Sequence, residues 1–88
     1  MNVDELWNEI LKNEGNTFFT KLKYPFEYEV QDSSKIRIFR NGSPMGYVTK
    51  DNIRFILENP NEQRHFYRDN IKERTTSYSL ALVTALKK

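Results

Sequence analysis

Apolar residues at the start of the chain recur every three or four positions, which is the spacing of one face of an α-helix. Asn2 followed by Glu5 has the pattern of a capping box, and Gly15 provides a C-terminal stop. The pattern predicts a helix over residues 3–13, with Trp7 on its buried stripe and the acidic residues on the opposite face.

After residue 16 the period changes to two, which is typical of β-strands. Residues 17–20 form a short β-prone run, and residues 26–30 alternate apolar and charged side chains. Turn-forming residues at 31–34 separate this run from a second alternating run at 35–40. The two alternating runs predict an antiparallel hairpin.

Alternation assigns the side chains of the second run to two faces of the hairpin. Ile36 and Ile38 are expected to point inward, because an apolar face must be buried. The other face then carries Lys35, Arg37 and Phe39, so that cations and an aromatic ring share the exposed side.

The segment that follows contains two of the three glycines and one of the three prolines. Residues 41–46 are therefore expected to form a loop with a mobile tip. Residues 47–49 follow as a third strand, and Thr49 or Asp51 is expected to cap a helix over residues 51–58, which an Asn-Pro pair ends.

Residues 61–74 are polar and basic and have no clear periodicity, although three apolar side chains among them offer anchors to the core, namely Phe66, Tyr67 and Ile71. Thr76 or Ser77 is expected to cap a last helix. The chain is thus predicted to be one α+β domain over residues 1–88, in which an N-terminal helix and two C-terminal helices cover one face of a three-stranded antiparallel sheet. Its core is predicted to depend on Ile10, Phe26, Tyr28, Ile36, Ile38, Ile56 and Leu82.

The composition agrees with a small folded domain. The chain has 88 residues, enough for one hydrophobic core, and 12 of them are Phe, Tyr or Trp, which argues against disorder. There is no cysteine, so neither a disulfide nor a zinc-thiolate site is expected, and the chain suits the reducing cytoplasm. No signal peptide or membrane span is expected, because the start is acidic and no apolar run approaches the ~20 residues that a span requires.

Charge is distributed unevenly along the chain. The formal net charge is +2, which does not by itself predict a polyanionic partner. Residues 1–16 contain four acidic residues against Lys12, so the basic excess lies in the rest of the chain. It is most visible in residues 35–54, where five cations oppose Asp51 alone.

Catalysis has weak support in the sequence. His65 is the only histidine, lies in a polar segment and has no cysteine or second histidine to act with. Glu27 and Glu29 alternate on one strand, which places both on its solvent face as ordinary surface charges. Gly42 and Gly46 lack the Gly-Lys-Ser/Thr sequence of a phosphate loop. We therefore expect no enzyme activity, no metal and no cofactor.

Two interpretations of the hairpin remain open. A strand that combines Lys35 and Arg37 with Phe39 offers phosphate contacts next to a stacking surface, as single-strand binders do. Alternatively, Glu27 and Glu29 on the partner strand pair with these two cations and leave a solvated charged face. This second interpretation does not cover three further cations that have no obvious acidic partner, namely Arg40, Lys50 and Arg54.

The chain resembles small winged-helix-type domains of bacterial mobile-element and restriction-associated proteins. The resemblance is carried by Phe19-Thr20, the run from Tyr24-Pro25 to Val30, Ile36-Arg37-Ile38 with Arg40, and the run from Ser77 to Leu82. It is similar in particular to the winged-helix single-stranded-DNA-binding proteins of cassette-type mobile elements. The resemblance implies that the hairpin is the wing and that the domain binds DNA. The predicted order differs in one respect, because winged helices place two helices before the wing and this chain places one.

We therefore predict a non-catalytic protein of a bacterial or phage mobile element that binds the phosphate backbone of nucleic acid, with single-stranded DNA as the expected ligand. The predicted contact residues are Lys35, Arg37, Phe39, Arg40, Tyr47, Lys50, Arg54, Arg64 and Arg68. The alternative is a small protein that binds and modulates a host protein through exposed aromatic residues, namely Tyr24, Phe39, Tyr47 and Tyr67. A third possibility is an accessory domain that dimerises through the strand at residues 17–20.

Overall fold

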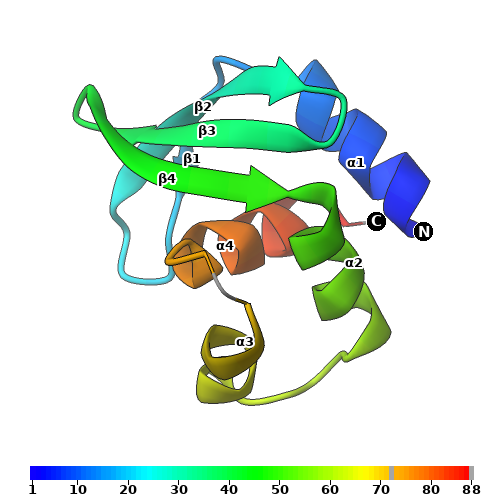
Figure 1. Cartoon of the computed structure of the whole chain (residues 1–88). Helices are drawn as coiled ribbons and strands as arrows, with labels where there is room; N and C mark the ends of the chain where they lie inside the picture. Colours follow the sequence, from blue (N-terminus) through cyan, green and yellow to red (C-terminus); the bar gives the residue numbers. More distant parts are fainter. Residues whose placement is uncertain (72, 88) are drawn as a thin grey trace.

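The chain folds into the predicted α+β architecture in a computed structural model, which describes residues 1–71 and 73–87. Figure 1 shows one sheet with helices packed beneath it. In chain order the elements are α1 (Val3–Lys12), β1 (Phe18–Phe19), β2 (Pro25–Asp32), β3 (Lys35–Arg40), β4 (Ser43–Thr49), α2 (Lys50–Glu58), α3 (Arg64–Asn70) and α4 (Thr76–Leu86).

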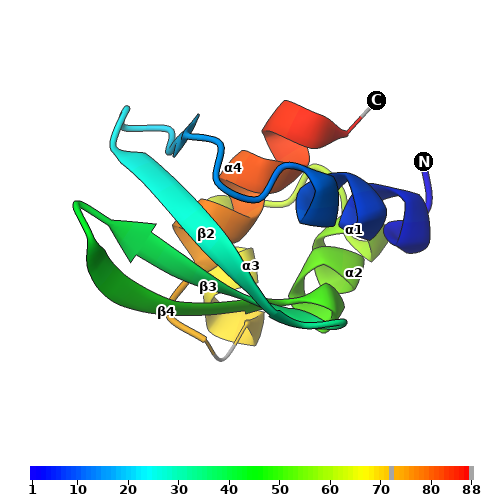
Figure 2. The same ribbon diagram turned by 90° about the horizontal axis from the view of Figure 1, so that it is seen from above.

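The four strands form one antiparallel sheet in the order β1-β2-β3-β4, so each strand pairs with its neighbour in sequence. Helices α1, α2 and α4 contact one another on the same side of this sheet, and Figure 2 shows α1 and α2 together at one end of the strands. The other face of β2, β3 and β4 is left without a covering helix. One face of the sheet is therefore open, and the helices pack against the other face.

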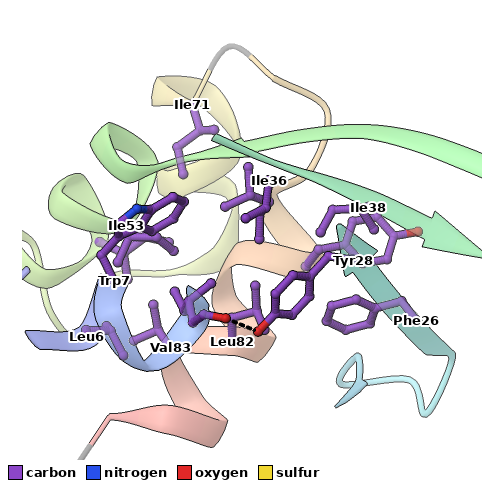
Figure 3. Close-up of a cluster of buried hydrophobic side chains, with 14 of the residues drawn as sticks. Leu6, Trp7, Phe26, Tyr28, Ile36, Ile38, Ile53, Ile71, Leu82 and Val83 are labelled. Atoms are coloured by element: carbon purple, nitrogen blue, oxygen red, sulfur yellow. Dashed lines mark hydrogen bonds between the residues drawn. The ribbon is translucent and has the colours of Figure 1, made fainter. Parts of the chain in front are cut away.

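The core lies between the sheet and the helices, where strand residues meet the apolar stripe of each helix (Figure 3). All seven residues predicted for the core are buried, and the prediction that Trp7 lies on the buried stripe of α1 is confirmed. Tyr28 also donates a hydrogen bond from its hydroxyl to the Ile10 carbonyl, 2.5 Å away, which ties the middle of the sheet to α1.

The predicted assignment of the two faces of β3 is confirmed. Ile36 and Ile38 have no exposed surface, whereas Lys35, Arg37 and Phe39 are half-buried on the opposite face. This is the result that strict alternation on one strand requires.

The sheet has four strands instead of three, and residues 41–46 are not the predicted loop. Asn41 and Gly42 alone form the turn, with φ values of 53° and 79°, which are the left-handed values of a type I′ hairpin turn. Strand β4 begins immediately afterwards and contains a bulge, because Ile38 pairs with Gly46 while Phe39 pairs with Pro44. These residues predicted a loop, but Gly42 lies in the turn, and Pro44 and Gly46 flank the bulge.

The helices that follow the sheet agree with the prediction at the start of α2 and differ from it in the presence of α3 and in the N-cap of α4. Thr49 caps α2 as predicted, since its side chain accepts a hydrogen bond from the Asn52 amide at 3.1 Å. The segment without clear periodicity contains α3, in which Tyr67 is 5% exposed, so the expected anchoring role is confirmed. The N-cap of α4 is Thr75, one residue before the predicted position, and it makes no side-chain capping hydrogen bond.

Two side chains join the ends of the sheet to distant parts of the chain. Trp7 donates from its indole nitrogen to the Ser33 carbonyl at 2.8 Å, which holds the β2–β3 turn against α1. Thr75 donates from its hydroxyl to the Tyr47 carbonyl at 2.7 Å, which holds the start of α4 against β4. Within the part of the chain that the structure describes, no helix is both long and apolar enough to cross a membrane.

Candidate nucleic-acid interface

Four of the predicted contact residues gather on the open face of the sheet. The register places Arg37 of β3 directly opposite Tyr47 of β4, with Phe39 two residues further along β3. The Arg37 guanidinium lies 5.6 Å from the centre of the Phe39 ring and 5.8 Å from that of Tyr47. The Lys35 ammonium lies 4.7 Å from the centre of the Tyr47 ring. All three distances are within cation–π range. We call Lys35, Arg37, Phe39 and Tyr47 the sheet-face cluster.

The alternative in which strand β2 neutralises this cluster is not observed. The register places Glu29 opposite Arg37 and Glu27 opposite Phe39. Yet among the described residues neither glutamate forms an ion pair with Lys35 or Arg37. Glu27 instead accepts a hydrogen bond from the Thr17 hydroxyl at 3.3 Å. The two cations are therefore held by aromatic rings, and their charges remain available to an anion.

Arg40 is separated from the cluster because it lies on the alternate side of β3. Its guanidinium carbon lies 3.9 Å from the centre of the Tyr24 ring, in the segment between β1 and β2. Tyr24 is 46% exposed, so this stacked pair is accessible at the surface.

Lys50 and Arg54 do have acidic partners, so the prediction that they lack them is wrong. The Lys50 ammonium lies 2.6 Å from the Asp4 carboxylate, and this hydrogen bond and charge hold the pKa of Asp4 below its usual value. Arg54 pairs with Asp51, three residues earlier on α2. The first partner comes from the other end of the chain, whereas the second follows from helical spacing.

The two paired cations line a cavity of about 630 Å³ between the β4–α2 junction and the end of α3. Asn52 also lines it and is 7% exposed; its side-chain nitrogen is buried and has no hydrogen-bond partner among the described residues. Asp51 and Glu73 lie in the same wall, so the cavity has a mixed charge.

Arg64 and Arg68 lie on α3, on the helical side of the molecule, and so do not extend the sheet-face cluster directly (Figure 1). They line a second cavity together with Arg74, which was not among the predicted contact residues. The sequence contained a signal for it, the concentration of arginines between residues 64 and 74. Which of them converge depends on the turn between α3 and α4.

The residues predicted for a protein partner are divided as well. Tyr67 is buried and donates from its hydroxyl to the Asn59 carbonyl at 2.5 Å, so it cannot serve as a surface anchor. The segment around the β1–β2 turn instead exposes two apolar residues. Phe19, in the strand considered for dimerisation, is 58% exposed, and Leu22, which was not predicted, is 69% exposed. Tyr24 lies in the same segment.

His65, the only histidine of the sequence, lines neither of these two cavities. His65 is exposed at the start of α3, as predicted for a solvated histidine. In the described part of the chain no three His, Cys, Asp or Glu side chains are grouped so that they could hold a metal ion.

The geometry defines a small α+β domain whose four-stranded meander carries helices on one face and a cation–aromatic cluster on the other. No protein-family model matches the chain, and no characterised protein or solved structure matches it either.

Proposed function

We propose that the domain binds nucleic acid without catalysing a reaction, and that single-stranded DNA lies across the open face of the sheet. The observation that carries this proposal is the sheet-face cluster, in which two cations are stacked on two aromatic rings. Cations supply contacts to phosphate oxygens, and exposed ring faces supply stacking surfaces for bases, independently of sequence.

The electrostatics of the sheet favour the side formed by β3 and β4. Lys35 and Arg37 attract phosphate groups to this side, whereas the charges of Glu27 and Glu29 on the neighbouring strand β2 repel phosphate groups. A backbone is therefore expected to follow β3 and β4 and to avoid β2.

The resemblance to winged-helix domains of mobile elements belongs to this proposal. In that interpretation the β2–β3 hairpin takes the place of the wing, and the protein belongs to a bacterial or phage mobile element and acts in the cytoplasm. The nearly helix-free face of the hairpin supports a role in which the hairpin approaches a nucleic acid directly.

Titration of a labelled single-stranded oligonucleotide at several salt concentrations tests the proposal. Each cation that neutralises a phosphate contributes about −0.7 to the slope of log affinity against log salt concentration. Arg37→Ala is expected to flatten the slope by about 0.7, and Tyr47→Ala is expected to weaken binding by about 1–3 kcal/mol through lost stacking. Lys12→Ala is the matched control, because Lys12 is an exposed cation on α1, on the helical side. Absence of binding at low ionic strength would rule the proposal out.

A protein partner is the second candidate, and the exposed residues of the β1–β2 segment favour it. Phe19 and Leu22 expose apolar surface in the same segment as Tyr24, and the Tyr24 ring lies against the Arg40 guanidinium. Interfaces concentrate aromatic residues and arginine. Under this candidate, Leu22→Asp is expected to abolish capture of a host protein that survives nuclease treatment. The same substitution should leave oligonucleotide binding unchanged under the favoured proposal.

A further inference from the structure

Three arginines line one cavity on the helical side of the domain. Arg64 and Arg68 come from α3, and Arg74 comes from the segment before α4. Glu73 is the one carboxylate among the described lining residues, so the lining carries an excess of two positive charges. Neither cation of the sheet-face cluster takes part, which makes this a separate basic site.

The arginines are only lightly engaged by the protein itself. Arg64 donates a hydrogen bond to the Ser77 hydroxyl, which is neutral and leaves the charge of the guanidinium unopposed. The Arg68 side chain is 70% exposed and lies 3.8 Å from the Asp69 carboxylate. An exposed ion pair at this distance has a small free energy, so it opens easily for a better anion.

The cavity is large enough for more than an inorganic ion. Its volume is about 460 Å³, within the range of roughly 300–1,000 Å³ that is typical of small-molecule pockets. Ser77 and Thr76 add hydroxyl groups to the wall, which can donate to phosphate oxygens or accept from a sugar. These dimensions suit a terminal nucleotide together with its phosphate.

A bond connects this cavity to the sheet face. Thr75 lies between Arg74 and the cavity residue Thr76, and its hydroxyl is bonded to the carbonyl of Tyr47, a member of the sheet-face cluster. Figure 1 shows the segment before α4 beside strand β4. The segment that carries Arg74 is therefore attached to β4, the strand at the edge of the sheet.

We propose that the cavity lined by Arg64, Arg68 and Arg74 binds the terminal phosphate of the nucleic-acid strand that occupies the sheet face, an inference that rests on the proposed function. A terminal phosphomonoester carries a charge of about −1.5 to −2 and three acceptor oxygens, whereas an internal diester carries a single charge. The excess of two positive charges in the lining matches the terminal group, and planar guanidinium groups bind its oxygens in pairs.

The test compares oligonucleotides of one sequence that carry a 5′-phosphate, a 3′-phosphate or no terminal phosphate, with the label on an internal base. One phosphorylated end is expected to lower the Kd by about tenfold, since hydrogen bonds to charged groups contribute more than neutral ones. Arg64→Gln with Arg74→Gln is expected to remove this preference. The ratio of the Kd values for the unphosphorylated and phosphorylated strands is measured within each variant, so that a general loss of affinity cancels. Arg64→Lys with Arg74→Lys keeps the charge but should still lose most of the preference, because a lysine does not provide the planar fork.

The outcomes separate this inference from the proposed function. Arg54→Gln is the matched control, since Arg54 is a half-exposed arginine that lines the other cavity, and it should keep the preference. Equal Kd values for the three oligonucleotides, or a preference that survives in the glutamine variant, would overturn the inference and leave the proposed function standing.

If no oligonucleotide binds, the proposed function fails. Titration with a nucleoside 5′-monophosphate then shows whether the cavity still binds a phosphomonoester. Shifts of the arginine side-chain NMR signals at residues 64, 68 and 74 would support the cavity as a phosphomonoester site, and unmoved signals would overturn it. Tighter binding of a phosphoserine peptide than of either phosphorylated strand would also overturn the assignment to a nucleic-acid end.

Discussion

The two faces of β3 come from one run of six residues and have opposite roles. Ile36 and Ile38 have no exposed surface and pack into the core, whereas Lys35 and Arg37, which alternate with them in the sequence, are half-exposed over aromatic rings. The inner face is determined by the hydrophobic effect, which needs no particular partner. The outer face depends on which residues the register of β4 brings alongside, so its chemistry is set by tertiary structure.

The largest expected effect comes from the inner face. Ile38→Ala removes a side chain with no exposed surface and leaves a cavity, so we expect the free energy of unfolding to fall by about 2–5 kcal/mol. Chemical denaturation followed by circular dichroism measures this change.

The neighbouring Arg37→Ala is the matched control on the outer face. It removes stacking on two rings at a half-exposed position, and we expect it to cost less than about 1 kcal/mol. Equal losses for the two variants would contradict the separation of the faces.

The turn that holds both faces in register is the next most sensitive point. Gly42 has a φ of 79°, a left-handed conformation that costs other residues roughly 1–2 kcal/mol. Gly42→Ala is therefore expected to lower the free energy of unfolding by about this amount. Gly42→Asn is the control, because asparagine tolerates this region better, and it should recover part of the loss. If alanine were accommodated without loss, the type I′ turn would be incorrect.

A smaller effect is expected from the hydroxyl of Tyr28, which lies on the inner face. Tyr28→Phe removes the hydrogen bond to the Ile10 carbonyl, and we expect a loss of about 0.5–1.5 kcal/mol near neutral pH. This carbonyl also accepts from the Asn13 amide at 3.2 Å, so it does not remain unpaired in the variant.

The same hydroxyl makes stability depend on pH in the alkaline range. Burial raises the pKa of Tyr28 above its ordinary value of about 10. A group whose pKa is higher in the folded state contributes stability fully below the unfolded pKa and loses it as the pH rises towards the folded pKa. The wild type should therefore lose more stability than Tyr28→Phe between about pH 9 and pH 11. Parallel curves for the two proteins would contradict the burial of this hydroxyl.

The sequence predicted what depends on local periodicity and missed what depends on distant neighbours. Alternation in β2 and β3 was sufficient to identify both faces, because one residue more or less exchanges them completely. Strand β4 was shortened to its last residues because Pro44 and Gly46 are typical of loops, and the bulge that accommodates them is a property of pairing with β3. The Asn-Gly pair at residues 41 and 42 was the signal that could have identified the hairpin.

The candidate sites follow the same division. The sequence placed Lys35, Arg37 and Phe39 together because they share one strand, but it could not show that the Tyr47 ring would lie opposite Arg37. It also treated Lys50 as unpaired, since its partner is Asp4, in a helix at the other end of the chain. The convergence of the three arginines on one cavity depends on how α3 and α4 pack, which no local pattern encodes.

The smallest expected effect concerns that pair of Asp4 and Lys50, which lies outside both faces of β3. The hydrogen bond and charge of Lys50 lower the pKa of Asp4, so the pair contributes stability above the unfolded pKa of about 3.9 and loses it as the pH falls through the lower folded pKa. Asp4→Asn should consequently be slightly less stable than the wild type near neutral pH, and the difference should shrink in acid below about pH 4. An NMR titration of the Asp4 carboxyl measures the pKa directly, and Lys50→Met is the control that should raise it towards the ordinary value. Lys50 was predicted to contact phosphate, but its ammonium is paired with the Asp4 carboxylate. Asp4→Asn removes that negative charge, so it should also strengthen oligonucleotide binding if Lys50 can reach the strand. Unchanged affinity would confine the phosphate contacts to the outer face of the sheet and the arginine-lined cavity.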